Sequence, residues 1–177
     1  MKKVLTLLLL LPIFITGCGK DKKMETPSDK VKNYLDSYIN LDDNVLTDLD
    51  DMIDNMTDYN DNQKERYKKI MKKHYENISY EIKSERVDDD VATVAVEIEV
   101  FDYSPIINNE YDEEDFTLED GSYDVEKFND FELDLFEKVD KKTRYTITFN
   151  LSKQDDVWVI DEPDDIVIQK IHGIYAY

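Results

Sequence analysis

The first third of the domain repeats its apolar residues at helical spacing. Thr26 and Pro27 suit the cap and the first position of a helix, and Asn60 with Gln63 forms a capping pair for a later one. Apolar residues that recur every three or four positions mark the buried face of a helix. The pattern predicts three consecutive helices, with stripes at Val31, Tyr34, Leu35, Tyr38 and Leu41, at Val45, Leu46, Leu49, Met52, Ile53 and Met56, and at Tyr67, Ile70, Met71, His74, Tyr75 and Ile78.

After residue 78 the apolar period changes to two, which is typical of strands. The cleanest alternation runs over 91–102 and 143–153, and weaker segments cover 79–87 and 157–161. Acid-rich turns at 88–90 and 154–156 separate neighbouring segments, and such short connections imply antiparallel pairing. We expect one face to pack under the helices through Val94, Val96, Ile98, Tyr145, Ile147, Phe149 and Trp158, and the other to be wet through Glu97, Glu99, Thr146 and Thr148.

An insertion of about 103–142 separates the two longest strands. Its first part is acidic and irregular, and its second part carries a rough helical stripe from Val125 to Val139. Near the end, 166–171 is dense in apolar residues, so a strand and a short helix stopped by Gly173 both remain open. The predicted fold class is α+β, with N-terminal helices packed on a curved antiparallel sheet of about four strands and a helical insertion between the two longest strands.

This order of elements resembles a known superfamily. The matching pieces are Thr26-Pro27 before 31–35, the segment 75–80, Ala92-Thr93-Val94, the strand 145–149 followed by Trp158, and the segment 170–175. Together they resemble the nuclear transport factor 2-like superfamily, also called cystatin-like α+β, and more narrowly small lipoproteins of low-GC Gram-positive bacteria. The resemblance implies a cone-like sheet. Because this superfamily hosts enzymes, ligand carriers and scaffolds, the fold leaves the function open.

The first eighteen residues have the pattern of an export signal. Met1-Lys2-Lys3 precedes an apolar run of twelve residues, 4–15, which Pro12 interrupts. A membrane span needs roughly 20 apolar residues, whereas a short run after a basic start is typical of a secretory signal peptide. The segment 15–18 resembles the lipobox of bacterial lipoproteins, in which the cysteine thiol takes a diacylglycerol and the chain is cut before it. The resemblance implies a signal peptide at 1–17, lipidation at Cys18, a flexible tether at 18–25 and a single domain at 26–177, held on the extracytoplasmic face of the cell membrane.

The net charge of the chain limits the classes of molecule that it can bind. Without residues 1–17 there are 20 Lys+Arg against 42 Asp+Glu, a net charge of −22. Binding to nucleic acid needs a basic surface, so nucleic acid is excluded as a partner. Cys18 is the only cysteine, and once lipidated it leaves no thiol for a disulfide or a metal. The polar outer face of the sheet predicts a monomer.

No catalytic motif stands out in the sequence. A glycine-rich phosphate loop and the common hydrolase and zinc-protease motifs are missing, so we assign no catalytic residue, no metal ligand and no cofactor. The residues that could line a pocket are the inward-facing Tyr34, Tyr38, His74, Tyr75 and Tyr145. They fill the core or surround a cleft for a small amphipathic ligand.

Two acidic segments, 48–58 and 110–115, are either solvated surface or sites for a cationic partner or weakly bound calcium. An EF-hand loop starting at Asp58 would place Gln63 at its glycine position and Lys69 at its glutamate position, so that motif fails. We expect 110–124 to form a mobile surface loop that Phe116 pegs to the domain. The predicted function is a membrane-anchored, non-enzymatic surface-interaction or ligand-binding module. The alternative is a small-molecule enzyme whose cone-shaped pocket uses His74 or a buried carboxylate as its base.

Overall fold

The computed structural model describes residues 24–176, so the predicted signal peptide, Cys18 and most of the tether lie outside the described residues. Three helices come first: α1 (Pro27–Ile39), α2 (Asp43–Asp54) and α3 (Asp61–Glu76). The strands β1 (Ser79–Asp88) and β2 (Val91–Phe101) follow. The insertion holds α4 (Ser104–Ile107), the 3-10 helix η1 (Glu113–Phe116) and α5 (Val125–Glu137). Then come β3 (Lys142–Gln154), β4 (Val157–Ile160) and α6 (Asp165–Ile171).

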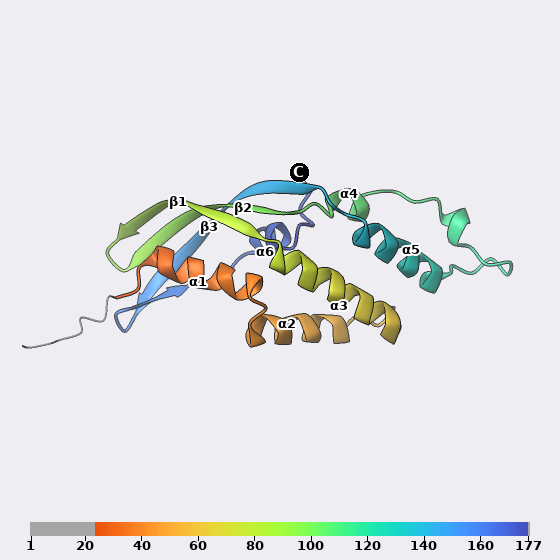
Figure 1. Ribbon diagram of the computed structural model, residues 1–177, viewed down its shortest axis with the longest axis horizontal. Helices are drawn as coiled ribbons and strands as arrows, with labels where there is room; N and C mark the ends of the chain where they lie inside the picture. Colours follow the sequence, from red (N-terminus) through yellow and green to blue (C-terminus); the bar gives the residue numbers. More distant parts are fainter. Residues whose placement is uncertain (1–23, 177) are drawn as a thin grey trace, which may run out of the picture.

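The four strands form one open antiparallel sheet in the order β1-β2-β3-β4. The helices α1, α2, α3 and α6 lie on one side of it, while the insertion extends beyond one end of the sheet (Figure 1). The tight turns place Asp89, Asp155 and Asp156 at positive φ, which Asp tolerates better than most residues. The predicted α+β class, with helices on a four-stranded antiparallel sheet and a helical insertion between the longest strands, is confirmed.

Local sequence signals place the helix starts. Thr26 and Asp29 form a reciprocal capping box on α1, and Asn60 and Gln63 form another on α3. Each box satisfies backbone N–H groups that the first turn of a helix leaves without partners. Pro27 occupies the first position of α1, where its missing N–H costs nothing. Both helix starts predicted from the sequence are confirmed.

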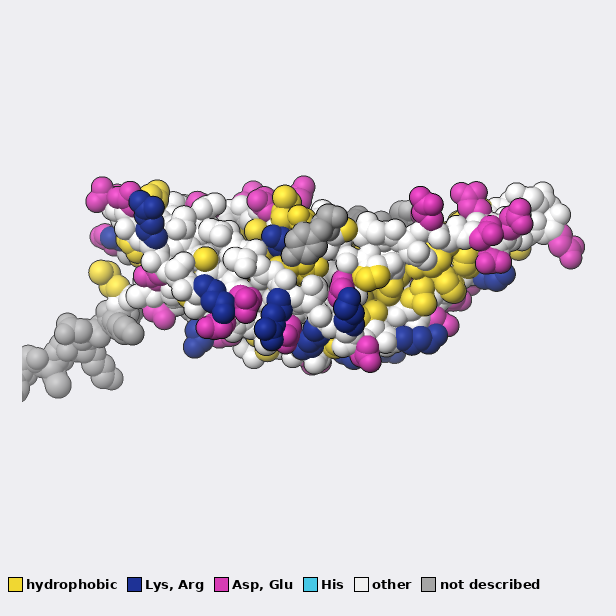
Figure 2. All heavy atoms as spheres, turned by 90° about the horizontal axis from the view of Figure 1, so that it is seen from above, with side chains coloured by type: hydrophobic (Ala, Val, Ile, Leu, Met, Phe, Trp, Pro, Cys, Tyr) yellow, Lys and Arg dark blue, Asp and Glu magenta, His cyan; other side chains and the backbone are white. Residues whose placement is uncertain are grey.

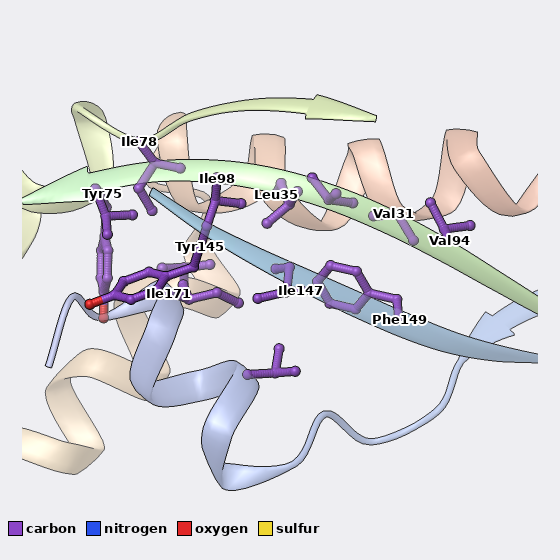
Figure 3. Close-up of a cluster of buried hydrophobic side chains, with 14 of the residues drawn as sticks. Val31, Leu35, Tyr75, Ile78, Val94, Ile98, Tyr145, Ile147, Phe149 and Ile171 are labelled. Carbon is purple, nitrogen blue, oxygen red and sulfur yellow. The ribbon is translucent and has the colours of Figure 1, made fainter. Parts of the chain in front are cut away.

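The core lies between the inner face of the sheet and the helices. Val94, Val96 and Ile98 of β2 have no exposed surface, and their neighbours on β3 are equally enclosed. Figure 3 shows Val94 and Ile98 of β2, with Ile147 and Phe149 of β3, in the same cluster as Val31 and Leu35 of α1. The outer face is polar, with Glu99 paired to Arg144 and Glu97 to Lys83. Trp158 is half-buried against the core. The predicted strand faces are therefore confirmed.

The C-terminal segment resolves an alternative that the sequence left open. Residues 165–171 form helix α6, which Asp164 caps through a hydrogen bond to the backbone N–H of Val167. The helix ends before Gly173, which has a φ of 71°. The backbone N–H of Tyr103 donates to the carbonyl of Gly173 at 2.8 Å. This hydrogen bond joins the C-terminal segment to the chain just after β2.

The acidic part of the insertion lies on the surface, as predicted, but contains short regular elements that the sequence did not predict. These elements are η1 and a bridge between Thr117 and Tyr123. Phe116 is buried and holds the loop against α5, because its ring packs on the rings of Phe128 and Phe131. Among the helices of residues 24–176, none is long and apolar enough to cross a membrane.

Two adjacent substitutions on β2 test the strand faces. Val96→Ala is expected to lower the free energy of unfolding by about 1–3 kcal/mol, because it leaves a cavity in a fully enclosed site. Glu97→Gln should cost about 0.5 kcal/mol or less, since its contact with Lys83 lies on the solvated face. Urea denaturation of the two variants measures both values. Equal losses would contradict the assignment of the faces.

Candidate functional site

A crevice of about 190 Å³ opens where four helices converge. Tyr38 comes from α1, Tyr75 from α3, and His172 caps the C-terminus of α6. The remaining lining comes mainly from α2, through Val45, Asp48, Leu49 and Met52, with Ile168 from α6. The crevice therefore combines aromatic rings, aliphatic side chains, a thioether and a single carboxylate.

Hydroxyl and imidazole groups meet at this crevice. The Tyr34 and Tyr38 hydroxyl oxygens are 3.3 Å apart, and the Tyr75 hydroxyl lies 3.3 Å from Nε2 of His172. The rings of Tyr38 and Tyr75 pack edge to face with centroids 5.1 Å apart. Burial raises the pKa of both Tyr38 and Tyr75, and the nearby Asp48 carboxylate adds to the rise. At neutral pH these hydroxyls are protonated and can donate hydrogen bonds.

His172 is neutral at neutral pH. Its side chain is half-buried beside the Tyr75 ring, and desolvation lowers its pKa to about 4. Asp48 is then the only charged group among the described residues that line the crevice. The sequence analysis did not include His172 or Asp48 in the pocket. The position of His172 could have been inferred from Gly173, because a glycine that ends α6 places the preceding residue at the helix C-cap.

His74 lies apart from the crevice. It has no exposed surface, and its ring packs beside Phe101 and Tyr103. Nε2 lies 2.8 Å from the carbonyl oxygen of Ile171, and because a carbonyl only accepts, Nε2 carries the proton and donates. Nδ1 is buried without a hydrogen-bond partner among the described residues. Burial lowers the pKa of His74 to about 4.

The five predicted pocket residues therefore separate into two groups. Tyr38 and Tyr75 line the crevice, and Tyr34 contacts Tyr38 through its ring and its hydroxyl. His74 faces the end of β2 instead, and the Tyr145 hydroxyl donates to the backbone carbonyl of Tyr175 at 3.0 Å. The three helical tyrosines contact one another, and the His74 ring touches the Tyr75 ring with centroids 5.8 Å apart, but His74 and Tyr145 do not line the crevice.

The buried His74 makes stability depend on pH. Its pKa in the folded protein is about 4, below the usual 6.5, so the unfolded chain binds the extra proton first as the pH falls. The stabilisation is complete above pH 6.5 and is lost between pH 6.5 and about 4. His74→Gln keeps an N–H donor for the Ile171 carbonyl and removes the titration. Its free energy of unfolding should fall less between pH 7 and 4.5 than that of the wild type, by about 2 kcal/mol.

Lys69→Gln, an exposed change on the same helix, is the control and should keep the wild-type dependence on pH. Denaturation curves at the two pH values give the comparison. Identical losses in the wild type and His74→Gln would show that His74 does not titrate in this range.

A second candidate site lies on the insertion. Five aromatic rings, from Tyr111, Phe116, Tyr123, Phe128 and Phe131, form one connected cluster with centroid distances between 5.1 and 6.3 Å. The exposed fractions of Tyr123 and Phe131 are 44% and 36%. We call this cluster, with the exposed neighbours Ile107, Leu118 and Val125, the aromatic surface. Figure 2 shows apolar side chains gathered on the projecting insertion, between the body of the molecule and an outer tip that carries carboxylates.

Polar contacts hold α5 against α3 and so orient the aromatic surface. Arg66 of α3 reaches Asp130, Asp134 and Glu137 of α5, with N–O distances of 3.2, 2.6 and 2.9 Å. Gln63, which is 1% exposed, donates to the backbone carbonyl of Glu126 at 3.0 Å. These contacts use one side of α5, and the rings of Phe128 and Phe131 lie on its other side.

The sequence around the aromatic surface is strongly acidic. Residues 110–124 contain eight acids and no Lys or Arg, and residues 103–142 contain fourteen acids against four lysines. Within residues 24–176, no group of three or more His, Cys, Asp or Glu side chains is arranged to hold a metal ion. The described residues therefore contain no preformed set of ligands for the weakly bound calcium that the sequence analysis considered.

Three comparisons complete the description of these two sites. A scan against protein-family models, a search of curated proteins and a search of solved structures found no match to this chain. Arguments about function therefore rest on the geometry of the crevice and of the aromatic surface.

Proposed function

We propose that this protein is a lipid-anchored, extracytoplasmic interaction module that captures a cationic, amphipathic segment of another protein on its aromatic surface. The observation that carries the proposal is the partly exposed five-ring cluster on an insertion that extends beyond the sheet (Figures 1 and 2). The anchor is the lipidated Cys18 that the export signal predicts.

The apolar side chains support a protein partner. Single exposed apolar residues are ordinary, but a contiguous exposed group rimmed by charges is typical of interaction sites. Phe131 joins the rings of Tyr111 and Phe116, with centroid distances of 5.2 and 5.3 Å, yet keeps 36% of its surface exposed. Burying such rings in a complex would supply the hydrophobic part of the affinity.

The negative charges around the aromatic surface indicate that the partner segment is positively charged. Acids precede and follow the rings along the chain, so a basic segment is attracted and an acidic one repelled. The protein already provides one example of the contact: the Lys127 ammonium lies 5.8 Å from the centroid of the Phe116 ring and donates to the backbone carbonyl of Asp115 at 2.7 Å. A partner with alternating basic and apolar residues would repeat this arrangement.

The enzyme alternative has less support. A general base must reach the proton that it removes. The side chain of His74 has no exposed surface, and its Nε2 is held by the Ile171 carbonyl. Glu132 is half-buried, and burial raises its pKa, but it accepts a hydrogen bond from Tyr59 between α3 and α5 rather than in the crevice. Neither group converges with the tyrosine hydroxyls.

A peptide experiment tests the proposal on the full chain in vesicles of neutral lipid, with protein-free vesicles as the blank. The probe is a fluorescent amphipathic helix built from Lys and Leu. Its comparators are a Glu/Leu peptide of the same pattern and a Lys/Ser peptide of the same charge. We expect the Lys/Leu peptide alone to bind, and Phe131→Ser to weaken that binding by about tenfold.

The matched control is Val159→Ser on β4, which removes an apolar side chain of similar exposure, 38%, far along the chain from the insertion. It should leave binding of the Lys/Leu peptide unchanged. Equal binding of the Lys/Ser peptide would mean that charge alone acts. Equal losses in the Val159 and Phe131 variants would overturn the assignment to the aromatic surface.

A further inference from the structure

We propose that the crevice among α1, α2, α3 and α6 is a binding site for a small organic cation, an alkylammonium of about the size of choline. This site is independent of the aromatic surface, because no residue that lines the crevice belongs to the insertion. The proposal rests on the combination of one solvent-exposed carboxylate, tyrosine rings and apolar side chains in a small surface crevice.

The electrostatics of the crevice favour a positive ligand. Among residues 24–176, Asp48 is its only acidic lining residue, and no Lys or Arg lines it. His172 does not oppose a cation at neutral pH, because desolvation keeps its imidazole neutral. The charge of Asp48 reaches the tyrosine cluster, where it helps to raise the pKa of Tyr34, Tyr38 and Tyr75. A cation placed among these rings would be stabilised by the same field.

The rings and apolar side chains suit a cation that carries methyl groups. Tyrosine faces attract ammonium groups through their quadrupole, and this attraction is how proteins recognise quaternary ammonium ligands. Tyr38 is half-buried, whereas Tyr75 is only 3% exposed and packs edge to face with Tyr38, so Tyr38 supplies most of the aromatic surface that a ligand could reach. Leu49 and Met52 complete a lining that would contact methyl groups but offers little to a strongly hydrated ion.

Other classes of ligand fit less well. A metal ion needs several charged or imidazole ligands, and Asp48 is the single carboxylate here. An anion would face Asp48 without a compensating base. The volume of about 190 Å³ lies below the roughly 300–1,000 Å³ of pockets for drug-sized molecules, so the ligand is small.

The test is calorimetric titration of the full chain in maltoside micelles with choline and with its uncharged carbon isostere, 3,3-dimethylbutan-1-ol. The two probes share a shape and differ in charge. We expect choline to bind about tenfold more tightly than the isostere. Asp48→Asn should weaken choline binding by about tenfold, whereas Asp51→Asn should leave it unchanged, because Asp51 is exposed on the same helix like Asp48 but does not line the crevice.

A second pair of variants separates the ring from the hydroxyl. Tyr38→Phe keeps the aromatic face and should keep choline binding, while Tyr38→Leu should lose it; circular dichroism establishes that each variant is folded. Equal affinity for choline and the isostere would overturn the proposal. Absence of choline binding at tens of millimolar, or an Asp48→Asn variant that binds like the wild type, would do so as well. Phe131→Ser should bind choline normally, so failure of the peptide experiment and failure of this one are distinguishable.

Discussion

Gly173→Ala is expected to lower the free energy of unfolding by about 3 kcal/mol or more, the largest stability effect predicted for this chain. A Cβ at this position would overlap the carbonyl oxygen of Phe101 and come within 3.0 Å of Cε1 of His74. Neither neighbour can yield cheaply, because Phe101 is paired in the sheet with Lys142 and His74 has no exposed surface. The φ of 71° adds backbone strain that alanine tolerates poorly.

Gly121→Ala is the matched control. Gly121 also has a positive φ, 84°, but apart from its chain neighbours no atom of residues 24–176 lies within 4 Å of the position that a Cβ would take. This variant should lose only the backbone part, about 1 kcal/mol. Urea denaturation of both variants isolates the steric part of the loss. If the two variants lost equal stability, the contact between the C-terminal segment and the end of β2 would not be as close as described.

Cys18→Ala is expected to release the protein from the membrane fraction or leave it uncleaved. The lipobox-like segment 15–18 predicts that this thiol carries the diacylglycerol and that residues 1–17 are removed. Each buried methylene of an acyl chain contributes about 0.8 kcal/mol, so two chains hold a protein at the bilayer whereas one holds it marginally. Cell fractionation followed by mass analysis of the N-terminus measures both location and cleavage.

Lys22→Gln, a change in the predicted tether, is the control and should fractionate with the wild type. A Cys18→Ala protein found in the membrane at the mature mass would contradict lipid anchoring. Cys18 lies outside the described residues, so this prediction rests on the sequence alone.

Features that depend on neighbours along the chain could be predicted from the sequence. The alternation over 91–102 identified the buried face of β2, since successive side chains of a strand point to opposite sides of a sheet. The capping boxes at Thr26 and Asn60 are formed by residues three positions apart, so they too are local. The segment 165–171 could not be assigned because its short apolar run lacks a period long enough to separate a helix from a strand.

Only the tertiary structure decided which residues line the crevice. His74 and Tyr75 are adjacent on one stripe, but successive helix positions are rotated by about 100°, and the packing sends His74 toward Phe101 and Tyr75 into the crevice. Asp48 and His172 join Tyr75 from other helices, at separations that no local pattern encodes.

The insertion shows the same division. Phe128 and Phe131 were visible as a helical stripe, and Phe116 was expected to peg the loop. Tyr111 and Tyr123 became part of the cluster only through the return of the loop onto α5. By itself the sequence determined the helices, the strand faces and the acidic charge, because each depends on residue type and short-range period; the export signal stays a prediction from the sequence. Tertiary packing decided which side chains meet, because contacts between distant segments depend on how whole elements bury their apolar faces together.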